Sequence, residues 1–232
     1  MINLGASPEK VFIAPNSSII EGNAKQDKKR RIKDNLNLDG KKIILFVGRL
    51  MKLKGIEYLI SAFARLRNEM GNVTLLLIGA GENETRLKCL CEELGVGEDI
   101  KFIGWVPRGD LVEYYELANV FVMPSIWQGY ADAFPMAVNE AMSFGKPVIA
   151  TDMVGSSYEL IHDGINGYVV PQRQVGPLYE AIKRIISNPE LGRKMGAESK
   201  RIIARGYTYK HMANGFKQAI EFVQQKYNLK TP

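Results

Sequence analysis

The chain has 232 residues, of which 46% are hydrophobic and 24% charged, and its formal net charge at pH 7 is +6. These proportions are typical of an ordinary globular protein, and no run approaches the roughly 18 apolar residues that span a bilayer. The positive charge favours an anionic ligand or a membrane surface. It is too small to indicate nucleic acid, and the sequence contains no zinc, stacking-aromatic or helix-turn-helix signature.

Targeting and redox features are few. The first ten residues lack a basic region followed by an apolar one, so we expect no secretory signal. The two cysteines, Cys89 and Cys91, form neither a CxxC pair nor a metal site, which indicates a reducing compartment. We therefore expect a cytoplasmic protein, with the inner face of the membrane as a second possibility.

The first 38 residues are expected to be a remnant strand and a basic linker. VFIAPNSSI (11–19) predicts a short strand and a Pro-Asn turn, and a single strand is not stable alone. It either joins the surroundings of the main sheet or belongs to a domain outside this chain. Residues 21–39 are polar and basic, which fits a solvated linker, a short surface helix, or a patch that touches acidic lipid through residues 28–31.

From Lys41 onward, apolar runs alternate with segments of helical periodicity. This alternation predicts an α/β domain with a doubly wound, Rossmann-like parallel sheet over residues 39–205, and a helical extension over 206–232. The expected strands are 42–48, 73–79, 100–104, 120–124, 147–151 and 167–171. The expected helices are 56–70, 81–95, 110–117 (with Asp110 as N-cap), 135–144, 156–161, 175–187, 189–205 and 209–227.

A ligand site is expected where the strands end, because parallel α/β sheets bind ligands outside the carboxyl ends of their strands. The loops concerned are 48–55, 79–82, 104–110, 125–134 and 151–157.

The most informative stretch is 124–152, which predicts strand, loop, helix and strand. Pro135 suits the first turn of a helix and Gly145 suits its left-handed end. The amides of residues 134–136, apart from Pro135, lie at the positive helix end and could bind phosphate. Asp132 could accept sugar hydroxyls or cap the helix. Glu140 could accept a ribose diol or be an exposed helical acid.

Two further loops carry candidate residues. In GRLMKLKG (48–55), Arg49 and Lys54 follow a buried strand, so they either hold a diphosphate or are solvated surface cations. The loop is not a P-loop. GAGENE (79–84) has two of the three glycines of a dinucleotide fingerprint, and we interpret it as a tight turn that could border a nucleobase pocket at Gly81. A dinucleotide oxidoreductase is the alternative.

Signs of covalent or metal catalysis are missing from the sequence. His162 and His211 have no interpretable Ser, Cys or Asp partner, and there is no GxSxG motif or metal-ligand cluster. We expect chemistry based on binding and leaving-group stabilisation, with no metal and no cofactor.

With these residues in view, the chain resembles the C-terminal, donor-binding domain of family 4 retaining glycosyltransferases, which have the two-domain GT-B architecture. The motifs occur in the family's order over nearly the whole chain: PNSSI, FVGRLMKLKGIEYLISAF, LLLIGAGENETRLK, IKFIGWVP, VFVMPS, DAFPMAVNEAMSFGKPVIATDMVGSSYELIHDGINGYVVP and YTYKHMA. The resemblance implies one half of a GT-B fold and a role in polysaccharide or glycoconjugate biosynthesis.

The resemblance also implies roles for single residues. Gly48, Arg49 and Lys54 match the loop whose cations grip the donor diphosphate. Asp132 and Glu140 match the two acids of a Glu-x7-Glu motif, which contact the donor sugar and the ribose. Further positions match the parts that touch sugar, phosphate and nucleobase: Ala133, Phe134, Pro135 and Met136 in the central loop, and the main chain at Ile103. Asp132 is one methylene shorter than the usual glutamate.

The leading hypothesis is therefore half of a retaining glycosyltransferase. It would bind a nucleotide-diphosphate sugar of UDP, GDP or ADP type, while a sugar or lipid-linked acceptor is held by an N-terminal domain that this chain lacks. Alone, the chain should be inactive, and the last helix should expose an apolar face toward the missing domain. A stand-alone nucleotide-binding module with a partner chain, and a GT-B nucleotide-sugar epimerase, are the alternatives.

Overall fold

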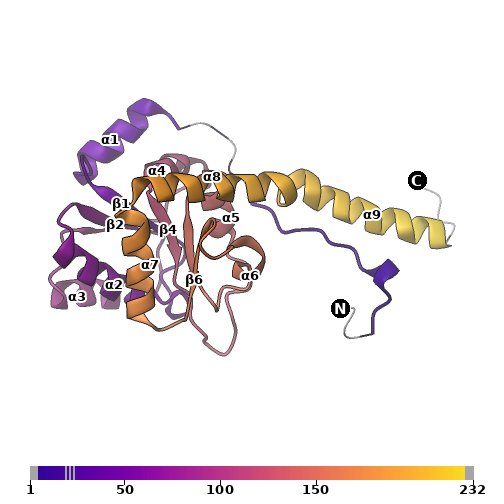
Figure 1. Ribbon diagram of the computed structural model, residues 1–232, viewed down its shortest axis with the longest axis horizontal. Coiled ribbons are helices and arrows are strands. Elements are labelled where there is room, and N and C mark those ends of the chain that lie inside the picture. Colours follow the sequence, from indigo (N-terminus) through magenta and orange to yellow (C-terminus); the bar gives the residue numbers. More distant parts are fainter. Residues whose placement is uncertain (1–4, 19, 21, 23, 228–232) are drawn as a thin grey trace.

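A computed structural model of the chain describes residues 5–18, 20, 22 and 24–227. Its centre is a six-stranded parallel sheet with the order β3-β2-β1-β4-β5-β6 (Figure 1). This confirms the expected doubly wound α/β architecture. The strands are β1 (Lys42–Val47), β2 (Val73–Ile78), β3 (Ile100–Gly104), β4 (Val120–Met123), β5 (Val148–Thr151) and β6 (Gly167–Val170).

Helices cover both faces of the sheet, which is why its inner strands are continuous apolar runs. The α-helices are α1 (Gln26–Leu36), α2 (Ile56–Glu69), α3 (Glu84–Glu93), α4 (Val112–Leu117), α5 (Met136–Ser143), α6 (Ser157–Leu160), α7 (Val175–Ile186), α8 (Pro189–Gly206) and α9 (Tyr209–Tyr227). Three 3₁₀ turns, η2 (Pro8–Lys10), η3 (Lys52–Lys54) and η4 (Arg108–Asp110), complete the regular structure of the described residues. Helix α2 packs against α3 and α7, and α5 packs on β4 and β5 and against α8.

Two details at helix ends differ from expectation. Asp110 does not cap α4: it ends η4, the helix begins at Val112, and the Asp110 carboxylate instead lies 2.8 Å from Lys28 Nζ. Pro135 precedes the first residue of α5 rather than occupying it. Gly145 has the expected left-handed conformation (φ 66°), and its N–H donates to Met142 O after the helix.

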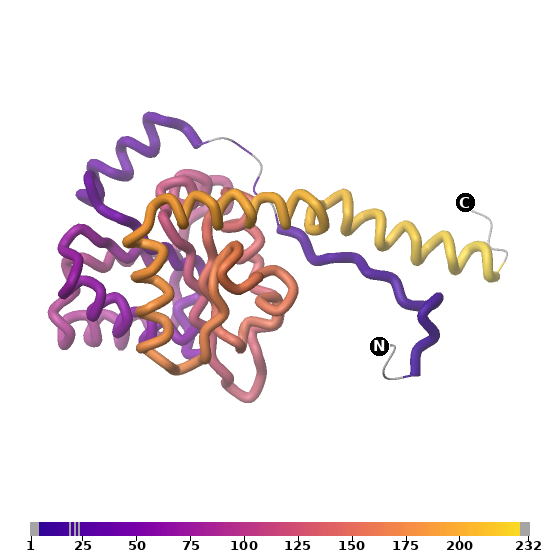
Figure 2. The backbone as a smooth tube through the Cα atoms, in the orientation of Figure 1, coloured from indigo at the N-terminus to yellow at the C-terminus, as the bar shows by residue number. Residues whose placement is uncertain are grey.

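The strand expected near the N-terminus is wrong. Residues 11–18 have no regular structure, because no sheet edge lies beside them to pair with their backbone. They run alongside α9 instead (Figures 1 and 2): the rings of Phe12 and Phe222 lie 5.3 Å apart, and a side chain at Gly215 would overlap Ile13. Residues 1–4, 19, 21, 23 and 228–232, which belong to the expected terminal segments, lie outside the described residues.

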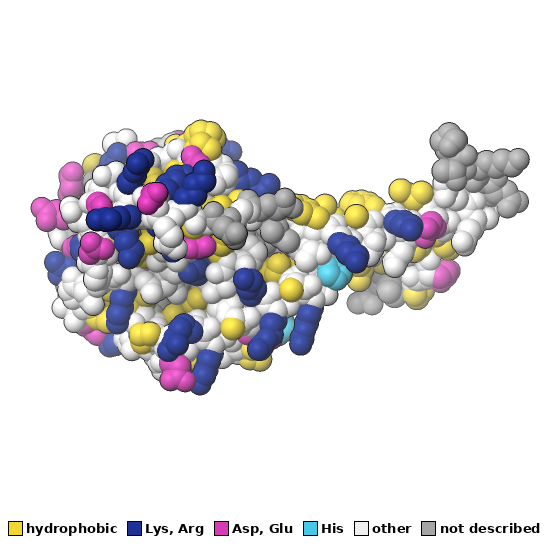
Figure 3. All heavy atoms as spheres, turned by 90° about the horizontal axis from the view of Figure 1, so that it is seen from above, with side chains coloured by type: hydrophobic (Ala, Val, Ile, Leu, Met, Phe, Trp, Pro, Cys, Tyr) yellow, Lys and Arg dark blue, Asp and Glu magenta, His cyan; other side chains and the backbone are white. Residues whose placement is uncertain are grey.

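Residues 5–18 and α9 together form an arm that projects from the domain (Figure 2). Hydrophobic side chains lie along it in Figure 3. The apolar residues Phe216, Ile220, Val223 and Tyr227 of α9 are 44–63% exposed, as expected for that helix.

The basic segment forms a helix, α1, as in the surface-helix interpretation. Lys28 Nζ lies 3.3 Å from the buried Glu113, and Lys29 Nζ lies 2.9 Å from Glu116. These bonds attach α1 to α4. Within the part of the chain that the structure describes, no helix is both long enough and apolar enough to cross a bilayer.

Candidate functional site

The order of the strands places a crevice between β1 and β4, where successive connections leave in opposite directions. A cavity of about 390 Å³ opens beside it, at the carboxyl ends of β1, β2 and β3. Three of the five expected loops contribute to it. The lining residues are Val47, Gly48, Arg49, Ile78, Gly79, Ala80, Trp105, Val106, Arg108 and Leu111.

Two glycines let these loops approach closely. Gly79 has φ 129°, and a Cβ there would overlap the carbonyl of Gly48. A Cβ at Gly81 would overlap the backbone of Leu50, so Gly81 packs behind the cavity rather than lining it. The tight-turn interpretation of GAGENE is therefore right. Ile103 is partly buried in β3, and it is the residues that follow, Trp105 and Val106, that reach the cavity.

The two cations of the loop after β1 have different surroundings. Arg49 is exposed and lines the cavity, and its guanidinium has neither a hydrogen-bond nor an ion-pair partner among the described residues. Lys54 Nζ lies 2.5 Å from Asp132 Oδ2, and both side chains are only 12% exposed. Ser125 Oγ donates to the same carboxylate oxygen at 2.6 Å. The structure thus brings Lys54 and Asp132 together across the crevice.

The loop that carries Asp132 is fixed to the loop after β5. The N–H of Asp132 donates to Met153 O, and its carbonyl accepts from the N–H of Gly155. A Cβ at Gly155 would overlap Ala133, so only glycine allows this approach. These contacts hold the Asp132 carboxylate against Lys54.

The start of α5 presents backbone donors. Ala133 and Met136 are exposed, Pro135 is buried, and Phe134 is intermediate. The N–H groups of Phe134 and Met136 have no acceptor among the described residues. Such groups at a helix N-terminus carry partial positive charge and suit an anion.

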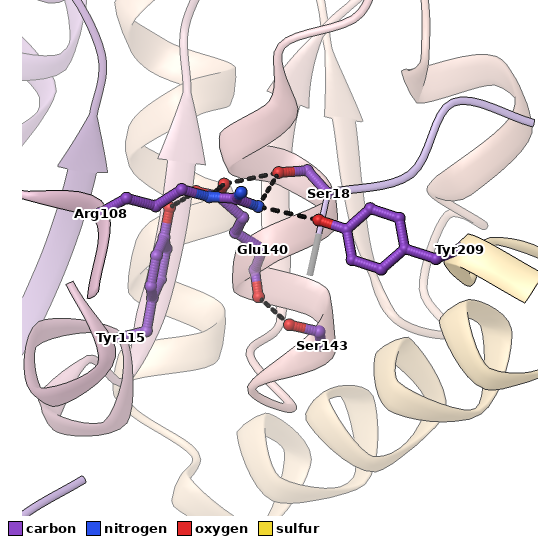
Figure 4. Close-up of polar contacts among 6 residues, drawn as sticks. All are labelled: Ser18, Arg108, Tyr115, Glu140, Ser143 and Tyr209. Atoms are coloured by element: carbon purple, nitrogen blue, oxygen red, sulfur yellow. Dashed lines mark hydrogen bonds and ion pairs between the residues drawn. The ribbon is translucent and has the colours of Figure 1, made fainter. Parts of the chain in front are cut away.

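Glu140 is not the exposed acid that one interpretation expected; it is 6% exposed. Three side chains hold its carboxylate (Figure 4): Ser18 Oγ donates to Oε1 at 2.6 Å, Arg108 Nε to Oε1 at 3.3 Å, and Tyr115 OH to Oε2 at 2.9 Å. Burial, and then the charge of Glu140, raise the pKa of the Tyr115 hydroxyl well above its usual value. Tyr115 therefore remains a hydrogen-bond donor to Glu140.

Arg108 both lines the cavity and donates to Glu140. It was not among the candidate residues predicted from the sequence. Its side chain is 53% exposed and lines the cavity, while Nη2 donates to Ser18 Oγ at 2.8 Å and to Tyr209 OH at 3.2 Å (Figure 4). Its place in the expected loop 104–110 was the one signal available for it.

The remaining candidates lie elsewhere. His162 Nε2 is 3.4 Å from Glu159 O and His211 Nδ1 is 2.7 Å from Thr208 Oγ1; neither histidine lines the cavity. Within the described ranges, no group of three or more His, Cys, Asp or Glu side chains could hold a metal ion.

A family model described as glycosyl transferases group 1 matches residues 27–202. The chain belongs to this family. It is 32% identical over 189 residues to an uncharacterised glycosyltransferase of Methanocaldococcus jannaschii, which covers 80% of this chain and 47% of that protein. The expected resemblance is confirmed.

Solved structures agree with this assignment. Sucrose-phosphate synthase from Thermosynechococcus elongatus is 27% identical with a TM-score of 0.78, over 92% of this chain and 52% of that one. HepE of Anabaena, in complex with UDP-glucose, is 21% identical with a TM-score of 0.79, over 97% and 60% of the two chains. The fold is thus that of a Rossmann-like half of a GT-B glycosyltransferase. The chain spans about half the length of the curated relatives it matches.

Proposed function

We propose that this chain is the donor-binding half of a retaining glycosyltransferase and binds a nucleotide-diphosphate sugar at the β1–β4 crevice. The observation that carries this proposal is the exposed Arg49, which faces the cavity without an anionic partner among the described residues. Lys54 follows in the same loop, and the N–H groups at the start of α5 come just after Asp132, which Lys54 contacts. A diphosphate needs cations and backbone donors in this arrangement.

The parts of the donor follow from the order of the loops. The nucleobase would enter the cavity between Gly48 and Trp105, near the main chain of Ile103, and the ribose would bind Glu140. The diphosphate would lie at Arg49 and Lys54. Asp132 and Ala133, at the end of the same crevice, would contact the sugar.

The chemistry asked of these residues is electrostatic. When the bond between the anomeric carbon and the β-phosphate breaks, its electron pair leaves with the diphosphate, whose charge Arg49, Lys54 and the α5 dipole stabilise. The acceptor hydroxyl attacks from the face of the leaving group and gives its proton to the departing phosphate. No metal or other cofactor is required in this proposal.

The acceptor would be a sugar or a lipid-linked sugar held by a domain outside this chain. In this proposal residues 39–205 are the donor domain, residues 1–38 lead into it, and residues 206–232 leave it. Because the chain spans about half of its relatives, we expect no transfer by this chain alone.

Contact with a membrane surface finds less support in the structure. Lys28 and Lys29 of the basic segment are engaged with acids of η4 and α4. Of residues 28–31, Arg30 and Arg31 are exposed, and Arg30 Nε lies 3.9 Å from Asp34 Oδ2 on the same helix.

Titration with nucleotides tests the proposal. A nucleotide at a hundred times its Kd stabilises the folded chain by about 2.7 kcal/mol, which for this size raises Tm by roughly 5–10 °C. UDP is the first probe, followed by GDP and ADP, and the matching nucleosides are the controls because they lack the diphosphate. If millimolar concentrations of none of the three diphosphates raise Tm above the nucleoside control, the proposal is wrong.

A further inference from the structure

We infer that Ser18 competes with the donor's ribose for Glu140, so that Ser18 and Arg108 set the affinity for the nucleotide and couple its binding to the attachment of the arm. The inference rests on the proposed function, because it takes the ligand to be a ribonucleotide. The Glu140 carboxylate already accepts three hydrogen bonds in the structure.

The oxygen Oε1 already receives two hydrogen bonds, from Ser18 Oγ and from Arg108 Nε, which use both of its lone pairs. Oε2 receives one, from Tyr115 OH. A ribose diol that donates two hydrogen bonds therefore finds one site on Oε2 and needs a second on Oε1. Either Ser18 or Arg108 has to leave that oxygen.

Tyr115 is not the group that leaves. Its side chain is fully buried and its ring stacks on Phe144 at 5.4 Å, so the hydroxyl is fixed against Oε2. Glu140 is also only 6% exposed, so a ribose reaches its carboxylate only after a covering group has moved.

Ser18 is the group best suited to leave. Its hydroxyl makes the same kind of bond that a ribose hydroxyl would make, so exchange leaves the carboxylate satisfied. The backbone around it is lightly held: none of the described N–H groups from residue 12 to residue 18 donates to another backbone group. Arg108, in contrast, stays anchored through Nη2 to Tyr209 OH.

Ser18 also belongs to the part of the chain that attaches the arm to the domain. Ser17 Oγ donates to Tyr207 O, Asn139 Nδ2 donates to Asn16 O, and Arg108 bonds both Ser18 and Tyr209 of α9. Figure 4 shows the Arg108 guanidinium beside the Glu140 carboxylate, with dashed lines from it to Ser18 and to Tyr209. Displacement of Ser18 by ribose therefore removes one of the bonds that hold residues 16–18 in place.

Coupling between two binding events is reciprocal. If ribose and Ser18 compete, removal of the Ser18 hydroxyl must tighten nucleotide binding, and nucleotide must loosen residues 11–18. A hydroxyl that only supported the fold would give the opposite result, with weaker binding or none of this dependence on the ribose hydroxyls.

The matched pair of variants is Ser18→Ala and Ser17→Ala. Both side chains are buried and both bond the arm's attachment, but only Ser18 contacts Glu140. Calorimetric titration of the 232-residue chain with UDP, GDP and ADP should show about three- to tenfold tighter binding to Ser18→Ala, the effect of one competing hydrogen bond. Ser17→Ala loosens the same attachment but leaves the bond between Ser18 and Glu140 in place, so it should tighten binding by less than Ser18→Ala does.

The 2′,3′-dideoxy forms of the same nucleotides supply the decisive comparison. They should bind wild type and Ser18→Ala equally. Unchanged or weaker binding of the ribonucleotides to Ser18→Ala overturns the inference while leaving the proposed function intact. Failure of the wild-type chain to bind any of the three nucleotides overturns the proposed function, and the inference with it.

Limited proteolysis of the wild-type chain gives an independent decision, which holds even if Ser18→Ala does not fold. Cleavage within residues 11–18, measured by mass spectrometry, should become faster with the ribonucleotide that binds and stay unchanged with its dideoxy form. Equal cleavage with both, or slower cleavage with the ribonucleotide, overturns the inference.

Discussion

Replacing Arg49 and Lys54 by alanine, one at a time, separates the two cations of the loop after β1. The Arg49 side chain is exposed and has no partner among the described residues, so Arg49→Ala should change the free energy of unfolding by no more than about 0.5 kcal/mol. Lys54→Ala leaves the Asp132 carboxylate, 12% exposed, without its cation. Breaking a fully buried pair costs about 3–5 kcal/mol and a surface pair up to about 1 kcal/mol.

The Lys54–Asp132 pair lies between these limits, and Ser125 continues to donate to Asp132. We therefore expect Lys54→Ala to lower the free energy of unfolding by about 2 kcal/mol, which lowers Tm by roughly 4–8 °C for a chain of this length. For nucleotide affinity we expect the opposite order, with the larger effect from Arg49→Ala. Arg49→Ala removes charge-assisted hydrogen bonds worth about 1.5–3 kcal/mol, so UDP should bind roughly ten- to a hundredfold more weakly.

Urea unfolding without ligand and calorimetric titration with UDP, GDP or ADP provide the two measurements. Arg31→Ala is the control, since Arg31 is another exposed arginine but lies on α1, outside the cavity lining. The reasoning fails if Arg49→Ala destabilises the free chain as much as Lys54→Ala does. It also fails if Arg49→Ala binds the nucleotide as tightly as the wild type.

Two further predictions concern other parts of the chain. Burial lowers the pKa of Lys146 to about 8, while its Nζ donates to the carbonyls of Glu116 and Ala118. Between that pKa and the ordinary 10.5, the unfolded chain binds more protons than the folded one, so stability rises with pH. From pH 7 to 9.5 the wild type should gain about 2 kcal/mol relative to Lys146→Met in urea unfolding, and parallel pH profiles would contradict this. Lys28 and Lys29 are engaged with acids of η4 and α4, which among residues 28–31 leaves Arg30 and Arg31 for lipid, and two such cations contribute only about 1 kcal/mol each. Neutralising Arg30 and Arg31 to glutamine should therefore leave the chain's sedimentation with anionic phosphatidylserine vesicles unchanged. Lost binding would favour the lipid-contact hypothesis instead.

The strands and most helices were predictable because their patterns are strong. A parallel strand covered on both faces is a continuous apolar run, and each of the six runs is a strand within a residue at either end. The N-terminal segment failed for the same physical reason: VFIA (11–14) has strand composition, but composition does not supply a neighbouring edge. Instead, the Phe12 ring packs on Phe222 of α9 and the backbone of residues 13–14 lies against Gly215, and the sequence gives no sign of these contacts.

The location of the site could be predicted from the sequence, but the contacts between its side chains could not. Strand ends located the loops that carry Arg49, Asp132 and Arg108, because topology fixes where the carboxyl ends meet. Which side chains pair there depends on three-dimensional approach, and Lys54 and Asp132 are 78 residues apart. The burial of Glu140 could be inferred from its neighbours in the sequence. Val138, Ala141 and Met142 are apolar, and in the structure all three are fully buried. An acid on so apolar a helix face has to find internal donors, and it finds them in Ser18, Arg108 and Tyr115.

Without a nucleotide, each of the two acids of the central stretch is paired with a cation from another loop. Asp132 is paired with Lys54 from the loop after β1, and Glu140 with Arg108 from the loop after β3. Arg49 is the cavity-lining cation that has no such partner among the described residues. Under the proposed function, an incoming diphosphate therefore gains the full attraction of Arg49, whereas Lys54 must divide its hydrogen bonds between the phosphate and Asp132. This difference is why Arg49→Ala is expected to act on affinity and Lys54→Ala on stability, although both cations follow the same strand.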